Sequence, residues 1–177
     1  ELVLLSMAFS VLFGVPIGVW AAVRRNSWFD HAMRVLAVSG VALPAFWAAL
    51  LLQMVFAVWL GWLPTSGQLS VATAPPDPLT GMILLDALLR GQWAVFAEAA
   101  RYATLPAFVL ALPSLAAIIR VNRAEMIEVM TADYVTAARA HGVAWARVVG
   151  WLALKNAMLP TLAMIWVPAG VQTILRD

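Results

Sequence analysis

The 177-residue sequence contains no cysteine and few charged residues. The lack of cysteine excludes disulfide scaffolds, cysteine–zinc sites, iron–sulfur clusters and thiol catalysis for this chain. Charged residues make up 11% of it, against roughly 25% in a typical soluble domain. Apolar residues make up 64%, and the mean hydropathy is +0.90. A soluble fold of this length has too little interior to hide so much apolar surface, so the lipid bilayer is the expected solvent.

Residue patterns for common chemistries are also missing. The only lysine is Lys155, and no Gly-x-x-x-x-Gly-Lys-Ser/Thr loop exists that could cradle the phosphates of ATP. No Gly-x-Ser-x-Gly nucleophile elbow is present, and the two histidines, His31 and His141, fall in separate connections. A net charge of +2 gives no reason to expect a nucleic-acid partner. We therefore expect no catalytic, metal or cofactor residues in this chain.

Four apolar stretches predict membrane spans, since a span needs about 20 apolar residues. Three of them carry no charged residue: 2–23, 35–63 and 102–119. The fourth, 148–175, is apolar apart from Lys155, Asn156 and Gln172. The second stretch is long enough to tilt or to carry a re-entrant end. The absence of Asp and Glu from the first three argues against a proton relay and favours a passive pathway. The expected fold is an all-α, polytopic transmembrane helix bundle.

Arginines in the connections predict the orientation. Residues 24–34 and 120–147 together hold seven arginines, whereas residues 64–101 hold two. The positive-inside rule places residues 24–34 and 120–147 in the cytoplasm. It places residues 64–101 and both chain ends on the other side of the membrane. The chain starts with Glu1 and stops without a cap or tail, so we expect a fragment of a longer protein.

The external connection, residues 64–101, begins with an irregular part rich in turn residues. Residues 82–90 are apolar with widely spaced charges. They fit a short helix on the membrane surface or a loop packed on the bundle, and both alternatives stay open.

Small residues and prolines interrupt the expected spans. Gly14 and Gly18 form a small-xxx-small pair around Pro16 that would let two helices approach closely. Further prolines are expected to kink the other spans: Pro44, Pro106, Pro113, Pro160 and Pro168. Kinked helices suit a bundle that rocks open and shut, and they equally suit a static one.

The cytoplasmic connection, residues 120–147, predicts a short helix outside the membrane. Thr131 is the expected N-cap, Asp133 lies in the first turn, and Gly142 is the expected C-terminal stop. The helix between these signals has about ten residues and is rich in alanine. It would either present a smooth ridge to a partner protein or simply anchor the connection at the membrane surface.

This connection resembles the cytoplasmic coupling loop of permease subunits of binding-protein-dependent ABC importers. That family's general pattern is Glu-Ala-Ala, three residues, Gly, nine residues and Ile-x-Leu-Pro. Thr136, Ala137, Ala138 and Gly142 keep this spacing, with Thr136 in place of the Glu. The peptide/nickel branch instead prefers Asp-Tyr-Val-x-x-Ala-Arg-Ala-x-Gly and Arg/Lys-Asn-Ala-x-x-Pro. The residues that match a functional position of the loop are Asp133, Tyr134, Thr136, Ala137, Ala138, Arg139, Gly142, Asn156 and Pro160.

The resemblance extends over most of the chain. Residues 14–18, with Gly14, Pro16 and Gly18, resemble the family's first hairpin, and residues 43–47 and 60–67 resemble the B-type half of the dipeptide/oligopeptide permease pair. Pro44 and Pro113 fall at matching positions. The residues after Ile165 depart from the expected Gly- and Leu-rich run. By this alignment the first and last of about six spans are missing.

The resemblance implies a type I ABC importer permease in the bacterial inner membrane. One permease domain would cover residues 1–177. The implied partners are a second, C-type permease subunit, two cytoplasmic ATPase subunits that bind the ATP, and a periplasmic or lipoprotein substrate-binding protein. The implied substrates are dipeptides, oligopeptides or nickel chelates.

The resemblance also implies a docking face for the ATPase on the short helix, formed by Tyr134, Ala137, Ala138 and Arg139. Gly142→Asp is expected to abolish transport without preventing insertion. Two alternatives remain: a membrane enzyme, such as an intramembrane protease or transferase, and a purely structural membrane subunit. The enzyme alternative would need acidic and basic side chains that act together at membrane depth, and this sequence has no such group of residues.

Overall fold

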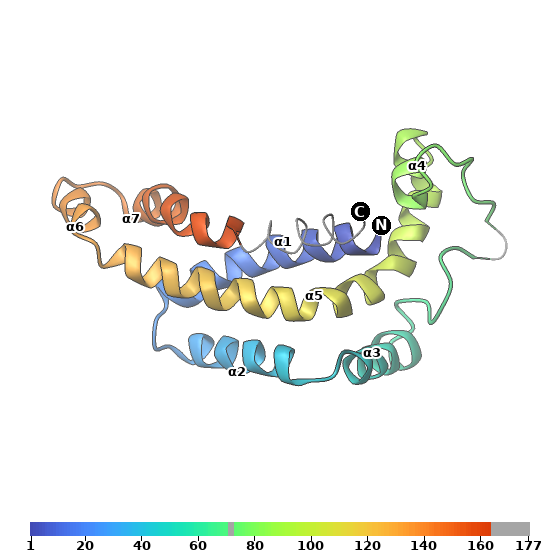
Figure 1. The fold of residues 1–177 in the computed structure, drawn as a ribbon, viewed down its shortest axis with the longest axis horizontal. Helices are drawn as coiled ribbons and strands as arrows, with labels where there is room; N and C mark the ends of the chain where they lie inside the picture. The colour runs from blue at the N-terminus through green and yellow to red at the C-terminus, as the bar shows by residue number, and fades with distance from the viewer. Residues whose placement is uncertain (71–72, 164–177) are drawn as a thin grey trace, which may run out of the picture. The chain divides into compact units, whose positions relative to one another are not determined.

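The structure is a computed structural model, and it describes residues 1–70 and 73–163 (Figure 1). All regular secondary structure in these residues is helical, which confirms the predicted all-α class. The elements are α1 (Leu2–Val23), α2 (Trp28–Ala42), α3 (Ala45–Gln53), the π-helix η1 (Met54–Trp59), α4 (Ile83–Leu89), α5 (Trp93–Met130), α6 (Asp133–Ala140), α7 (Trp145–Arg147) and the π-helix η2 (Val148–Ala153). Residues 154–163 continue after η2 as α-helix.

Within residues 1–70 and 73–163, two single helices are long and apolar enough to cross a membrane. α1 has the bounds predicted for the first span, and α5 contains the predicted span 102–119 within a helix of 38 residues. α5 extends beyond that span at both ends, from Trp93 to Met130, and the polar residues that follow the span, including Arg120 and Glu125, are good helix formers. Pro106 and Pro113 lie inside α5 without interrupting it.

The predicted span 35–63 differs from the structure, because it is not one helix. α2 ends at Ala42 and α3 begins at Ala45, with Pro44 as its N-cap residue in an extended conformation. Proline has no N–H to donate and pushes the residue before it away from helical geometry. Trp28–Gly40 and Ala45–Trp59 are long and apolar enough to cross a membrane only when they are taken together. Because the pair is bent at the break between them, it is either a broken span or a re-entrant loop.

The fourth predicted span, 148–175, is described only as far as residue 163. Within that part η2 and residues 154–163 are helical, and Pro160 lies inside the helix. Pro168 and the departure expected after Ile165 lie outside the described residues.

The described chain divides into two compact units. One consists of Glu1–Phe9 and Leu43–Leu112, and the other of Ser10–Ala42 together with the residues from Pro113 onward. α1 and α5 each contribute a part to both. Whether the chain acts as the single permease domain predicted from the sequence stays a prediction.

In the second unit α1 and α5 approach closely at the predicted glycine pair. A Cβ added at Gly14 would lie 2.8 Å from Cγ2 of Ile118, and one added at Gly18 would lie 3.1 Å from the carbonyl oxygen of Ile119. Asn122, also on α5, is fully buried and donates a hydrogen bond of 3.1 Å to the carbonyl oxygen of Val15. The prediction that these glycines permit close helix packing is confirmed.

Gly14→Ala is expected to destabilise the full-length protein by about 1–3 kcal/mol, because Ile118 is β-branched and cannot move its methyl group without leaving its rotamer. Thermal unfolding in detergent measures the effect. Gly150→Ala is the matched control, since a Cβ at that helical position meets nothing within 4 Å. Equal midpoints for the two variants would contradict the close packing.

In the first unit two buried or half-buried carboxylates order the external connection. Asp86, in α4, accepts hydrogen bonds from the backbone N–H groups of Leu79, Thr80 and Gly81 and from the Thr80 hydroxyl. Glu98, in α5, accepts from the Ser70 N–H at 2.9 Å and the Thr73 hydroxyl at 2.7 Å. Residues 82–90 therefore contain the helix that the sequence left open, and the segment before it is tied to α4.

The hydrogen bond from the Thr80 hydroxyl lowers the pKa of Asp86 despite its burial, and the three backbone donors lower it further. Because the folded-state pKa is depressed, this stabilisation is complete above the usual aspartate pKa of about 3.9. It is lost as the pH falls through the lower folded-state value.

Asp86→Asn is expected to raise the hydrogen-exchange rates of the amides of residues 79–81 by about tenfold at neutral pH, since an amide oxygen is a weaker acceptor than a carboxylate. Asp77→Asn is the control, because the Asp77 side chain is 86% exposed and accepts a hydrogen bond of 3.2 Å from the Arg90 side chain. Unchanged protection in Asp86→Asn would show that the carboxylate does not hold this segment.

Candidate functional site

α6 begins after a two-residue turn at the end of α5. The predicted N-cap, Thr131, is wrong: the N-cap residue is Ala132, with extended backbone angles and no side-chain cap. The Thr131 hydroxyl donates to the carbonyl oxygen of Glu128 at 2.7 Å and so closes α5 instead of opening α6. Asp133 lies in the first turn of α6, as predicted, where a carboxylate favours the positive end of the helix.

Gly142 ends α6, as the sequence predicts. Its φ is +80°, and its N–H donates to the carbonyl oxygen of Arg139 at 3.0 Å. The N–H of Val143 donates to the carbonyl oxygen of Ala138 at 3.1 Å. This pair of bonds is a Schellman motif, which requires a left-handed residue at the position of Gly142. The chain therefore reverses sharply between α6 and α7.

α6 buries one side chain and leaves most of its surface open. Val135 is 1% exposed, and α6 packs against η2. Ala138 is half-buried. The exposed residues of the helix are Asp133, Tyr134, Thr136, Ala137, Arg139 and Ala140. Three of the four predicted docking residues are therefore accessible, and Ala138 lies at the edge of the packed side.

Two predicted site residues from different parts of the loop meet in the structure. The side-chain amide of Asn156 donates to the Tyr134 hydroxyl at 3.0 Å and to the carbonyl oxygen of Leu152 at 3.1 Å. Asn156 lies in the helix that follows η2. The hydrogen bond therefore ties α6 to that helix in addition to the packing of α6 on η2.

Arg139 stacks on an aromatic ring across the turn. Its guanidinium carbon lies 5.0 Å from the ring centroid of Trp145, and both side chains are exposed. Such a cation–π contact orients the side chain while leaving its N–H donors accessible. Pro160 is half-buried in the helix of residues 154–163.

A hydrophobic core of three alanines and one methionine joins η2 and the helix after it to α1 and α5. It consists of Ala22 of α1, Met126 of α5, and Ala153 and Ala157, with half-buried Val19, Ile127, Val129, Met130, Val149 and Leu154 packed around it. Alanines let the helices approach closely and leave little room for sliding. α6 is therefore seated on a helix that packs directly on α1 and α5.

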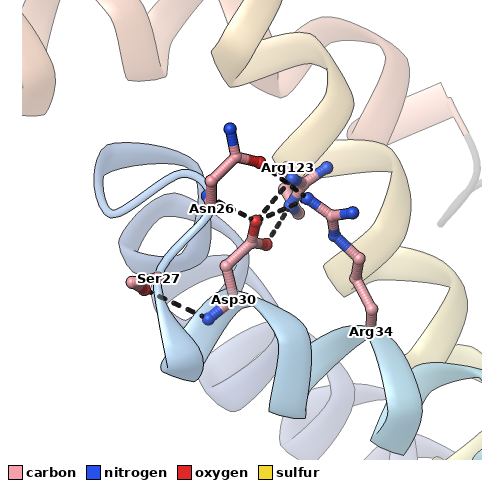
Figure 2. Close-up of polar contacts among 5 residues, drawn as sticks. All are labelled: Asn26, Ser27, Asp30, Arg34 and Arg123. Atoms are coloured by element: carbon pink, nitrogen blue, oxygen red, sulfur yellow. Dashed lines mark hydrogen bonds and ion pairs between the residues drawn. The ribbon is translucent and has the colours of Figure 1, made fainter.

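Figure 2 shows a buried ion-pair cluster in the same unit. The carboxylate of Asp30, near the start of α2, is fully buried. It binds Arg123 of α5 through two bonds, at 2.5 and 2.8 Å, and Arg34 at 2.7 Å. The N–H of Asn26 donates to the same carboxylate at 3.0 Å, and the Ser27 hydroxyl accepts the N–H of Asp30 at 3.3 Å. One acid thus joins the two arginine-rich connections.

Sequence reasoning missed this cluster, although it singled out both connections. A usable signal was present, since Ser27 and Asp30 have the Ser-x-x-Asp spacing of a capping box. Asp30 is also the only acid among the arginines of residues 24–34. The pairing with Arg123 brings the two connections predicted to be cytoplasmic to one place within the second unit.

No group of three His, Cys, Asp or Glu side chains that could hold a metal ion occurs within residues 1–70 and 73–163.

The described residues thus combine helices long and apolar enough to cross a membrane with a short, exposed helix, α6. The chain belongs to the family described as binding-protein-dependent transport system inner membrane component, which it matches over residues 14–167. It is thus a multi-pass membrane component of the permease type.

Curated relatives are similar over nearly the whole chain. A di/tripeptide transport system permease protein DppB from Pseudomonas aeruginosa is 43% identical over 96% of this chain and 50% of its own length. The dipeptide transport system permease protein DppB of Escherichia coli is 40% identical over 96% of this chain and 51% of its own length. The peptide transport system permease protein SapB of Salmonella typhimurium is 34% identical over 92% of this chain and 51% of its own length. The chain spans about half the length of these relatives, all of which are named as transport permeases.

Proposed function

We propose that this chain forms part of the translocation pathway of an ATP-driven importer for dipeptides or oligopeptides. The observation that carries the proposal is its 40–43% identity to permeases named for di- or tripeptide transport. Nickel chelates, which the sequence analysis kept beside peptides, have no comparable support.

We further propose that α6 is the surface on which a cytoplasmic ATPase acts. Its exposed residues, including Tyr134, Ala137 and Arg139, lie on a helix whose C-terminal end is closed by the turn at Gly142. The side chain of Ala137 is small and projects little from the helix, so a partner protein can approach the backbone closely. Two ATPases, a C-type permease subunit and a substrate-binding protein complete the proposed assembly.

A push on α6 would be transmitted through two contacts. Val135 is buried in the packing of α6 on η2, and Tyr134 is bound by Asn156. The helix that carries Asn156 packs through Ala153 and Ala157 on α1 and α5. Because close-packed interiors shift between discrete arrangements more readily than they deform, movement of α6 would reorient the helices that bear it.

The proposed orientation places α6 and the connection after α1 in the cytoplasm, and residues 64–101 outside. The support is the distribution of arginines, seven against two. In this arrangement the segment held by Asp86 and Glu98 faces the substrate-binding protein.

Uptake by proteoliposomes tests the proposal. The full-length subunit is reconstituted with its partner permease, ATPases and binding protein, and uptake of a radiolabelled dipeptide is followed with and without internal ATP. ATP-dependent uptake that unlabelled di- and tripeptides inhibit supports the proposal. Uptake that peptides leave unchanged and a nickel chelate inhibits would contradict the peptide assignment.

A further inference from the structure

A groove rich in arginine lies in the second unit, next to the Asp30 cluster. It has a volume of about 660 Å³, within the range of ligand pockets in proteins. The connection after α1, α2 and α5 contribute its walls. Four of its lining residues are arginines: Arg25, Arg34, Arg120 and Arg123. No Asp or Glu is among the described residues that line it.

The positive charge of the groove is only partly balanced. Asp30 lies beside it and pairs with Arg34 and Arg123. Arg25 and Arg120 are exposed, and in the described part of the chain neither makes an ion pair. Four cations against one buried acid leave a surplus that favours an anionic ligand.

Apart from Asn26, the rest of the groove is apolar. Its other walls are formed mainly by Met33, Ala37, Val38, Ile119 and Ile127. Val38 is 65% exposed although it is an aliphatic residue. A ligand that fills the groove should therefore have an anionic head and an apolar tail, since a small free anion would leave this wall in contact with water.

The arginines lie where a lipid headgroup would be. Arg25 follows α1 by two residues, and Arg120 directly follows the predicted uncharged stretch 102–119. Both spans thus end at the depth of these side chains. Arginine guanidinium groups bind phosphate oxygens through paired hydrogen bonds, and basic pockets between membrane helices are known to hold anionic headgroups.

We propose that this groove binds one anionic phospholipid of the cytoplasmic leaflet, with its phosphate between Arg25 and Arg120 and an acyl chain along Val38 and Ile119. The lipid would complete the charge balance around Arg34 and Arg123 and so brace α2 against α5. The inference depends on the proposed orientation and not on which solute is transported.

Native mass spectrometry of the full-length subunit in detergent tests the proposal. The protein is titrated with dioleoylphosphatidylglycerol, with dioleoylphosphatidylcholine and with inorganic phosphate, and bound lipids are counted. The test variant is Arg25→Gln/Arg120→Gln. The control variant, Arg24→Gln/Arg147→Gln, removes the same charge from exposed residues that do not line the groove.

The wild type and the control are expected to bind one phosphatidylglycerol in preference to phosphatidylcholine. In the test variant this preference should fall by about thirtyfold, the effect of two arginines at an anionic headgroup. Equal affinity of the wild type for both lipids would overturn the proposal, as would an equal loss in the control. Displacement of the lipid by millimolar inorganic phosphate would assign the groove to a free anion. These readouts involve no transport, so failure of peptide uptake would leave them interpretable.

Discussion

Gly142→Val is expected to reduce ATP-dependent uptake to below about a tenth of the wild-type rate while the protein still inserts into the membrane. Gly142 has a φ of +80° at the end of α6, and a left-handed backbone costs a β-branched residue about 1–3 kcal/mol. No atom lies within 4 Å of an added Cβ, so the defect arises from the backbone and not from a clash. The turn from α6 into α7 would open, and the face of α6 would tilt away from its partner.

Two further substitutions at Gly142 separate this explanation from a general loss of function. Gly142→Asn should retain most of the uptake, because asparagine tolerates the left-handed region. The backbone preference of aspartate alone would give Gly142→Asp an uptake rate between those of the Asn and Val variants. Because it also adds a carboxylate at the negative end of α6, its uptake rate is expected to be closer to that of Gly142→Val. Uptake measured in proteoliposomes containing equal amounts of protein ranks the variants. A Gly142→Val protein with normal uptake would contradict the role of this turn.

Asp30→Ala is expected to destabilise the protein by about 3–5 kcal/mol, because it leaves the partly buried Arg123 without its counter-charge. Arg123 is 17% exposed and binds Asp30 through two hydrogen bonds, so little water can replace the lost partner. Arg34 is 45% exposed and can be solvated. Thermal unfolding and hydrogen exchange of the connection after α1 measure the loss.

The control and the rescue for this prediction come from the same chain. Asp77→Asn breaks an exposed ion pair with Arg90 and should cost less than about 1 kcal/mol. Asp30→Ala/Arg123→Met should recover part of the stability, since it removes both buried charges together. If Asp30→Ala unfolds at the wild-type temperature, the cluster shown in Figure 2 does not hold α2 to α5.

Features that depend on local sequence were predicted well. The bounds of α1 follow from one uncharged run, and Gly142 follows from the need for a left-handed residue after a helix. Gly14 and Gly18 were predicted to allow close packing because they lack side chains, and both face α5. The family pattern pointed to Tyr134 and Asn156, although only the structure shows that they bind each other.

Features that depend on competition or on distant residues were not predicted. The hydroxyl of Thr131 could cap α6 or bond the backbone of α5. It donates a hydrogen bond to the nearby carbonyl oxygen of Glu128 in α5, so it does not cap α6. An uncharged run does not reveal where Pro44 divides it into two helices. Asp30 and Arg123 are far apart in the sequence, and their pairing depends on how α2 packs on α5. Each of these outcomes is decided by geometry that no local pattern contains.

Site-directed cross-linking tests the central claim, that α6 is the surface on which the ATPase acts, most directly. The 177 residues contain no cysteine, so once any cysteine elsewhere in the full-length subunit is replaced by serine, a single cysteine can be placed at exposed Ala137 and, as a control, at exposed Ala94 near the start of α5. Full-length subunits carrying each cysteine are expressed with their partner proteins and treated with a short thiol-to-amine cross-linker. The account predicts an ATPase adduct at position 137 that changes in yield with ATP, and none at position 94. No adduct at position 137, or equal adducts at both positions, would contradict it.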